Sequence, residues 1–228
     1  MAIIQLLLSS HIDNEVLSGR AIDVAAAVGH LDIVKYLVAA GISASRAMDT
    51  ASASGFLDIV RWLHENTSHC SSECAIDCAA SQGHLDVVKW LHDNRNEGCT
   101  VYAMNNAVSN GHFRVVQWLH ENSTEGCATK ALNSTAGGGN LEMVKWLHLN
   151  RSEGCTSAAT NYAAANGHLD VVKWLHVNRS EGCTTEAMDM AAEYDHLEVL
   201  KWFDQNRTEG FTFHVIRVAV RRAETNFA

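Results

Sequence analysis

Histidine is the residue type with the most potential for chemistry in this sequence, because its imidazole can bind a metal ion or transfer protons near neutral pH. The chain of 228 residues contains 13 histidines. Ten of them recur at two positions of a repeated pattern. The first position follows a glycine, or once an aspartate, and the second follows Trp-Leu: His30, His84, His112, His168 and His196, then His64, His92, His120, His148 and His176.

Neither histidine set has the geometry of a metal site. Each copy lies in its own repeat unit, and adjacent units are separated by roughly 8–10 Å, the distance between packed helices. Within a unit the two positions are eight residues apart, which is about 12 Å along a helix. A zinc ion needs every ligand at roughly 2.0–2.3 Å. We therefore interpret both histidine sets as structural.

Cysteine is the second residue type to consider. Cys99, Cys127, Cys155 and Cys183 occupy one repeated position, and Phe211 replaces them in the next copy, which indicates small apolar filling. Cys70, Cys74 and Cys78 are different, because their spacing of four places Cys74 and Cys78 on one helical face near His69. A zinc or redox site there is an open alternative, although the spacing matches no standard ligand motif.

Catalytic sets are missing from the sequence. No Ser/His/Asp or Cys/His combination stands outside the recurring positions. The glycine run Gly137–Gly139 is not followed by the lysine of a phosphate-binding loop. The sequence therefore predicts a protein that is not an enzyme and that needs no cofactor and no metal.

These residues recur because the chain repeats one motif. The segment Gly83–His92 returns unchanged as Gly167–His176, and looser copies surround both. One large aromatic marks each copy, with spacings of 26 and then 28 residues, and includes all six tryptophans: Tyr36, Trp62, Trp90, Trp118, Trp146, Trp174 and Trp202. Such a period is typical of a solenoid of stacked units.

Each unit is predicted to contain two helices. The first is short and rich in alanine, and it ends at the recurrent glycine, which tolerates the positive φ of a helix stop. The second runs from Leu85 to about Asn94 in the best copy and has apolar residues on two faces. Such a helix lies between neighbours rather than on a surface. No part of the sequence shows a strand pattern.

The repeat boundaries follow from this alignment. We expect a single repeat domain over 1–228, with an N-terminal half repeat and a C-terminal half repeat or cap. The predicted units are 1–18 (half), 19–44, 45–72, 73–100, 101–128, 129–156, 157–184, 185–212 and 213–228 (half or cap).

The consensus Ala-Met-Asp-x-Ala-Ala-x-x-Gly-His-Leu-Asp-Val-Val-Lys-Trp-Leu resembles the ankyrin repeat over nearly the whole chain. That family's first helix reads Thr-Pro-Leu-His-x-Ala-Ala, and its second follows Gly-His-Leu with Val-Val-x-x-Leu-Leu. The resemblance implies an all-α, helix-turn-helix solenoid. It also implies a non-catalytic module that binds a partner protein through the concave face of helix one and the short loops.

Two departures from the family pattern matter. The period is 28 instead of the usual 33, so we expect the β-hairpin fingers between units to be shortened or absent. The Thr-Pro-Leu-His motif is also missing, in a chain without proline. We expect the short polar residues at its histidine position to hydrogen-bond the adjoining loop backbone instead: Asp23, Asp49, Asp77, Asn105, Asn133, Asn161 and Asp189.

Function is expected where the copies differ, because the constant positions build the fold. The predicted partner-binding residues precede the recurrent alanine or glycine, or lie on helix one: Arg20, Arg46, Gln82, Tyr102, Asn110, Lys130, Tyr162, Asn166, Glu186, Asp189, Glu193 and Tyr194. The tyrosines are the preferred anchors. The charges make this face basic at its start and acidic at its end, which suits a protein partner of basic or mixed charge. The alternatives are a solvated face, a structural spacer, or a fragment of a larger repeat protein or assembly.

Composition restricts the remaining classes. With 17 basic and 26 acidic residues the formal charge is −9, which argues against a nucleic-acid partner. No apolar run approaches the roughly 20 residues that cross a membrane, and the N-terminus lacks the basic leader of a signal peptide. Seven cysteines, an odd number, suit a reducing, cytoplasmic location. We expect a monomer, unless the apolar N-terminal half repeat, with Ile3, Ile4, Leu6 and Leu7, self-associates.

Overall fold

The computed structural model describes residues 19–67, 74–206, 212–213 and 215–217. All regular structure in these residues is helical, with no strand. The predicted N-terminal half repeat 1–18, most of the predicted C-terminal half repeat 213–228, and Cys70 of the cysteine cluster lie outside the described residues.

The described residues pack as two compact units. The first unit contains the residues up to Ala107 together with His112–Gly126, and the second contains Val108–Gly111 and the residues from Cys127 onward. The helices of the first unit form pairs joined by a tight turn: α2 (Gly19–Ala27) with α3 (Leu31–Ala39), α4 (Ala47–Ser54) with α5 (Leu57–Asn66), α6 (Cys74–Gln82) with α7 (Leu85–Asn94), and α8 (Val101–Ser109, whose end belongs to the second unit) with α9 (Phe113–Asn122).

The second unit repeats the same arrangement. Its pairs are α10 (Thr129–Gly137) with α11 (Leu141–Asn150), α12 (Ala158–Ala165) with α13 (Leu169–Asn178), and α14 (Thr185–Glu193) with α15 (Leu197–Asn206). The observed bounds of α7 agree with the predicted second helix from Leu85 to Asn94.

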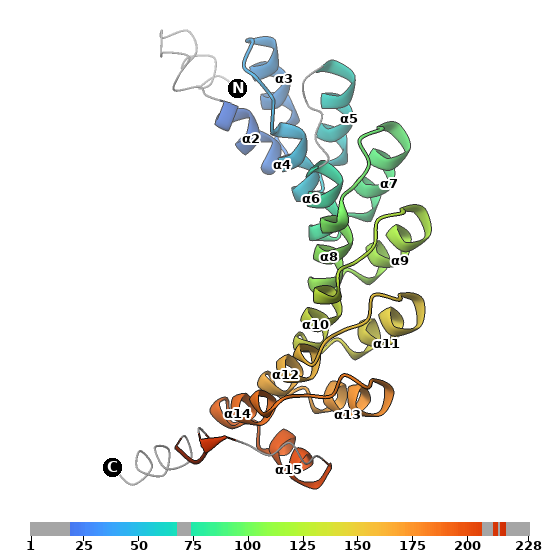
Figure 1. The fold of residues 1–228 in the computed structure, drawn as a ribbon. Coiled ribbons are helices and arrows are strands. Elements are labelled where there is room, and N and C mark those ends of the chain that lie inside the picture. Colours follow the sequence, from blue (N-terminus) through green and yellow to red (C-terminus); the bar gives the residue numbers. More distant parts are fainter. Residues whose placement is uncertain (1–18, 68–73, 207–211, 214, 218–228) are drawn as a thin grey trace, which may run out of the picture. The chain divides into compact units, whose positions relative to one another are not determined.

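Each unit has two layers, which Figure 1 shows as two parallel rows of helices. The helix-one layer is formed by α2, α4 and α6 in the first unit, and by α10, α12 and α14 in the second. The helix-two layer is formed by α3, α5, α7 and α9 in the first unit, and by α11, α13 and α15 in the second. Successive helices in a layer contact each other, so every repeat is packed mainly against its neighbours.

The core explains why the residue types recur. Small side chains such as Ala47, Ala51 and Ala79 are fully buried and let the first helices approach closely. Larger residues, Val88 and Leu91 in the second helix, are also fully buried and fill the space between the layers. The all-α repeat fold is thus confirmed, and those residues between the helix pairs that the structure describes form loops without a strand.

The turn glycine has two roles. Gly83 has a φ of +81°, which residues with a Cβ rarely adopt. A Cβ placed there would also lie 2.5 Å from Nδ1 of His112, the turn histidine of the next repeat. The glycine therefore ends the first helix and leaves room for the imidazole that packs over it.

Within the described part of the chain, every helix is too short or too polar to cross a bilayer.

Candidate functional site

At Asp77, Asn133, Asn161 and Asp189 the Asp/Asn position of helix one makes the hydrogen bonds that the sequence predicts. In the first unit Asp77 accepts a bond from the backbone N–H of Thr100 at 2.9 Å and one from its hydroxyl at 2.5 Å. Thr100 lies 23 residues later, where the loop enters the next repeat. Its oxygen in turn accepts the N–H of Tyr102 at 3.1 Å. The polar side chain thus fixes the start of the next first helix.

The same pair of hydrogen bonds recurs in the second unit. Asn133 accepts the N–H of Thr156 at 3.0 Å and donates to its hydroxyl at 2.9 Å. Asn161 makes the equivalent two hydrogen bonds with Thr184, at 3.1 and 2.8 Å. Asp189 accepts both the N–H and the hydroxyl of Thr212, at 2.9 and 2.6 Å. We call these bonds, together with those of Asp77 and Thr100, the polar ladder. The hypothesis that short polar residues replace the missing family histidine agrees with these contacts.

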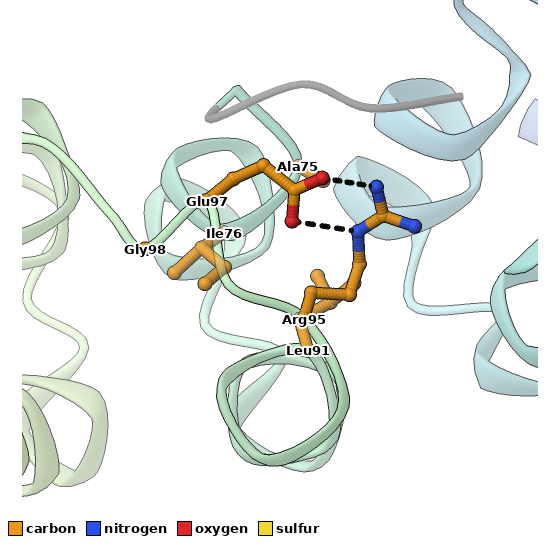
Figure 2. Close-up of a pocket in the computed structure, with 6 residues that line it drawn as sticks. All are labelled: Ala75, Ile76, Leu91, Arg95, Glu97 and Gly98. Atoms are coloured by element: carbon orange, nitrogen blue, oxygen red, sulfur yellow. Dashed lines mark hydrogen bonds and ion pairs between the residues drawn. The ribbon is translucent and has the colours of Figure 1, made fainter. Parts of the chain in front are cut away.

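The loops after α7, α11 and α13 each hold an ion pair between an arginine and the glutamate two residues later, which we call the Arg-x-Glu clasp. Figure 2 shows both carboxylate oxygens of Glu97 facing the Arg95 guanidinium, near Ile76 and Leu91. The two bonds are 3.1 and 2.5 Å long. The hydrogen bond from Arg95 lowers the pKa of Glu97. Arg95 also reaches back to Nδ1 of His64 at 3.2 Å, so the clasp joins two repeats.

Clasps of the same kind join repeats of the second unit. Arg151 pairs with Glu153, and Arg179 with Glu181. Glu153 also accepts the backbone N–H of Cys127 at 3.2 Å, and Arg179 contacts Nδ1 of His148 at 3.1 Å.

Two of the repeated cysteines, Cys127 and Cys155, lie beside clasps of the second unit. Cys127 and Cys155 are each only 8% exposed, and burial raises the pKa of both thiols. A buried thiol with a raised pKa is a poor nucleophile. This environment fits the packing role that the Phe211 replacement suggested.

The two histidine sets have separate packing partners. The turn histidines bond a carbonyl of the preceding repeat: Nε2 of His84 lies 3.2 Å from Ala53 O, and that of His112 lies 3.0 Å from Ser81 O. The histidines after Trp-Leu stack edge-on against the next tryptophan, with ring centres 5.0–5.3 Å apart: His64 on Trp90, His92 on Trp118, His148 on Trp174 and His176 on Trp202. The tryptophans are half-buried, so they pack between repeats rather than in the central core.

Metal ligands do not gather in the described structure. Among the residues it covers, no group of three His, Cys, Asp or Glu side chains is placed to hold a metal ion. Cys74 is exposed and Cys78 half-buried on α6, while Cys70 falls in the gap at 68–73.

The predicted partner-binding residues of the first unit lie on its first helices α2, α6 and α8 or directly before α4. Arg20, Arg46, Gln82 and Tyr102 are all exposed, and Tyr102 presents 64% of its surface. Arg46 lies close enough to Asp23 to oppose the rise that burial causes in the pKa of that carboxyl.

In the second unit most predicted residues are likewise exposed. Asn110 lies exposed before the turn glycine Gly111, which ends the short segment Val108–Gly111 of this unit. The other exposed members are Lys130, Tyr162, Asn166, Glu186, Glu193 and Tyr194. Asp189 differs, because it is half-buried and its carboxylate holds Thr212 in the polar ladder. Asn166 has a structural bond as well, from its amide to Gly137 O at 2.7 Å.

Several exposed apolar residues were missed by the sequence reasoning. Val24 is 62% exposed on the helix-one layer of the first unit, while Leu149 and Val177 are each 79% exposed near the ends of α11 and α13. The signal was present in the repeat alignment, because the position of Leu149 and Val177 carries Glu65, Asp93 or Glu121 in earlier copies.

Comparison with protein-family models agrees with the repeat architecture. The model described as "Ankyrin repeats (many copies)" matches residues 76–120, and the one described as "Ankyrin repeats (3 copies)" matches residues 104–186. A search of curated proteins returned no match. Ankyrin repeats are generally protein–protein interaction modules. Over residues 76–186 the chain is therefore a member of the ankyrin repeat family.

Proposed function

We propose that this protein is a non-catalytic interaction module that binds a partner protein through its helix-one side chains and short loops. One observation carries the proposal: many side chains that recur between repeats are buried or bonded to the next repeat, whereas most of the predicted binding residues, which differ between repeats, are exposed. The ladder residues and clasps belong to the first class. Tyr102 and Tyr194 belong to the second.

The exposed set suits protein recognition. Tyr102, Tyr162 and Tyr194 are 64%, 46% and 56% exposed, and tyrosine combines a rigid apolar ring with a polar end, as binding hot spots require. The first unit adds Arg20 and Arg46, and the second adds acidic groups. These charges favour a partner whose own charges are basic or mixed.

Two further features support the proposal. The residue types with catalytic potential are largely taken up by packing, as in the His148–Trp174 contact and the buried thiol of Cys155. A reducing, cytoplasmic site of action is part of the proposal and rests on the odd number of cysteines in the sequence.

A quantitative binding experiment tests the proposed face. A partner is captured by the immobilised full chain from cells that produce it and is then purified. Its Kd is measured by calorimetry for wild type, for Tyr102→Ala, and for the double variant Tyr162→Ala/Tyr194→Ala. The matched control is Leu149→Ala/Val177→Ala, which truncates two side chains of the helix-two layer that are each 79% exposed.

We expect at least one tyrosine variant to weaken binding by about tenfold, since a hot-spot truncation costs more than roughly 1 kcal/mol. The control is expected to stay within about twofold. The reverse pattern, with binding lost only in the control variant, would move the interface to the helix-two layer and overturn the proposal.

A further inference from the structure

The second unit has an exposed surface whose side chains indicate which chemical class of protein partner it would bind. We define the tyrosine face as Tyr162 on α12, Glu186, Met190 and Glu193 on α14, and Tyr194 directly after α14. We propose that this face binds an extended segment of a partner protein that contains lysine or arginine. The inference rests on the proposed function and adds the chemistry of the ligand.

Helix register brings these residues to one side. Glu186, Met190 and Tyr194 follow each other at intervals of four, which lines them up along α14. Tyr162 is the counterpart of Met190 on α12, exactly one repeat earlier, and α12 packs directly against α14. The carboxylate of Glu186 accepts a bond from the Asn161 amide at 2.9 Å, which places it beside the residue that precedes Tyr162.

A glycine on α10 sets how closely Tyr162 approaches that helix. A Cβ on Gly137 of α10 would lie 2.9 Å from the Cβ of Tyr162, so only glycine lets the Tyr162 backbone sit so close to α10. The Asn166 amide then bonds Gly137 O at 2.7 Å and fastens the two helices at this point. Tyr162, 46% exposed, is therefore held directly against α10.

The charge of this face selects a basic ligand. The described helices α12 and α14 contain no lysine or arginine, whereas α14 has exposed Glu186 and Glu193. The exposed Asp195 follows Tyr194 and lines a shallow pocket of about 320 Å³ with Leu197 and Glu198. Lys130 on α10 is the one basic side chain of the helix-one layer described in this unit.

The side chains present match what a cationic segment needs. Carboxylates form charge-assisted hydrogen bonds with guanidinium and ammonium groups. Exposed tyrosine rings attract the same cations through their negative faces. Phosphate-bearing ligands and anionic lipid surfaces are repelled by the acidic groups, so a peptide with lysine or arginine is the ligand class that this chemistry favours.

A peptide-display selection tests the inference directly. Random linear 12-residue peptides are selected on the immobilised full chain, and the best binders are synthesised. Their affinities are measured for wild type, Glu186→Gln/Glu193→Gln and Tyr162→Ala/Tyr194→Ala. Glu142→Gln/Asp170→Asn is the charge-matched control, because both residues are exposed acids of the helix-two layer.

We expect the selected pool to be enriched in lysine and arginine and depleted in aspartate and glutamate. The Glu and Tyr double variants are each expected to weaken binding by about tenfold, and the control by less than about twofold. Raising the salt from 0.05 to 0.5 M should weaken wild-type binding, because screening shortens the reach of the charges.

The other outcomes separate the inference from the proposed function. Peptides without basic residues whose binding still depends on the tyrosines overturn the ligand class and leave the proposed function standing. A selection that enriches no linear peptide has the same consequence. Basic peptides that bind the Glu variant as tightly as wild type also overturn the ligand class. Binding lost only in the helix-two control Glu142→Gln/Asp170→Asn overturns both.

Discussion

The polar ladder gives the sharpest stability prediction. Asp77→Ala removes the acceptor of two hydrogen bonds, one from the Thr100 backbone N–H at 2.9 Å and one from its hydroxyl at 2.5 Å. Both donors are only half-buried, so water replaces part of what is lost. The substitution nevertheless frees the loop that positions α8 behind α6.

The cost can be worked from these two bonds. Hydrogen bonds to a charged group contribute about 1.5–3 kcal/mol each, and partial exposure favours the lower end, about 3 kcal/mol for the pair. Alanine has a better helix propensity than aspartate, which offsets about 0.5 kcal/mol. We therefore expect Asp77→Ala to lower the free energy of unfolding by about 2–2.5 kcal/mol.

Asp77→Asn is the matched control, because the chain already contains the asparagine form of this rung. Asn133 and Asn161 accept the threonine N–H and donate to its hydroxyl, at 2.8–3.1 Å. In the variant the Thr100 hydroxyl changes from donor to acceptor and the backbone bond stays. The expected loss is below about 1 kcal/mol.

Urea unfolding followed by tryptophan fluorescence and circular dichroism measures both variants. With a slope of about 2 kcal/mol per M, Asp77→Ala should lower the midpoint by about 1 M and Asp77→Asn by less than half of that. Hydrogen exchange of the Thr100 and Tyr102 amides should accelerate in the alanine variant. An alanine variant as stable as wild type, or an asparagine variant as damaged as the alanine one, would refute the ladder argument.

Three further predictions concern the turns, the clasps and the cysteines. In Gly139→Ala the new Cβ would sit at a φ of +74° and only 2.5 Å from the His168 ring. Gly41 has a similar φ of +80°, but a Cβ there would meet nothing within 4 Å. Gly139→Ala should therefore lower the melting temperature clearly more than Gly41→Ala, and equal losses in calorimetry would contradict the packing of the His168 ring on Gly139. Burial opposes ionisation of Glu153, but hydrogen bonds from Arg151 and from backbone N–H groups outweigh it and lower its pKa below 4.5. The stability that the ionised Glu153 contributes is therefore complete above about pH 4.5 and is lost as the pH falls through the lowered pKa. The stability difference between wild type and Glu153→Gln should shrink between pH 5 and pH 3, and a constant difference would count against the clasp. The purified chain should carry no stoichiometric zinc by elemental analysis, and a melting temperature that falls on adding a chelator would restore the cysteine-cluster alternative.

The helices were predictable because residues that end a helix recur at the same positions in successive repeats. A glycine closes the first helix and the conserved spacing to Asn94 closes the second, so the predicted and observed bounds of α7 agree. The hydrogen-bonding role of Asp77 and its counterparts was also predictable, since a short polar residue stood where the family has histidine. These are local properties, set by residue type and position within one repeat.

The contacts between repeats were not predictable in the same way. The clasp from Arg95 to His64 joins residues 31 positions apart, and the seat of the His112 ring on Gly83 depends on how closely two turns approach. Likewise, the repeat pattern grouped Asp189 with the partner-binding acids, but its carboxylate is held by Thr212.

The sequence by itself therefore determined the repeat period, the two-helix unit and the positions that vary between units. Only the tertiary structure decided which variable residues are exposed, because exposure depends on what the neighbouring repeat covers. It separated Tyr162 and Tyr194, which face solvent, from the ladder and clasp residues, whose polar groups are used between repeats. Periodicity in the chain sets which face a side chain lies on, but only the packing of adjacent repeats sets whether that face stays open.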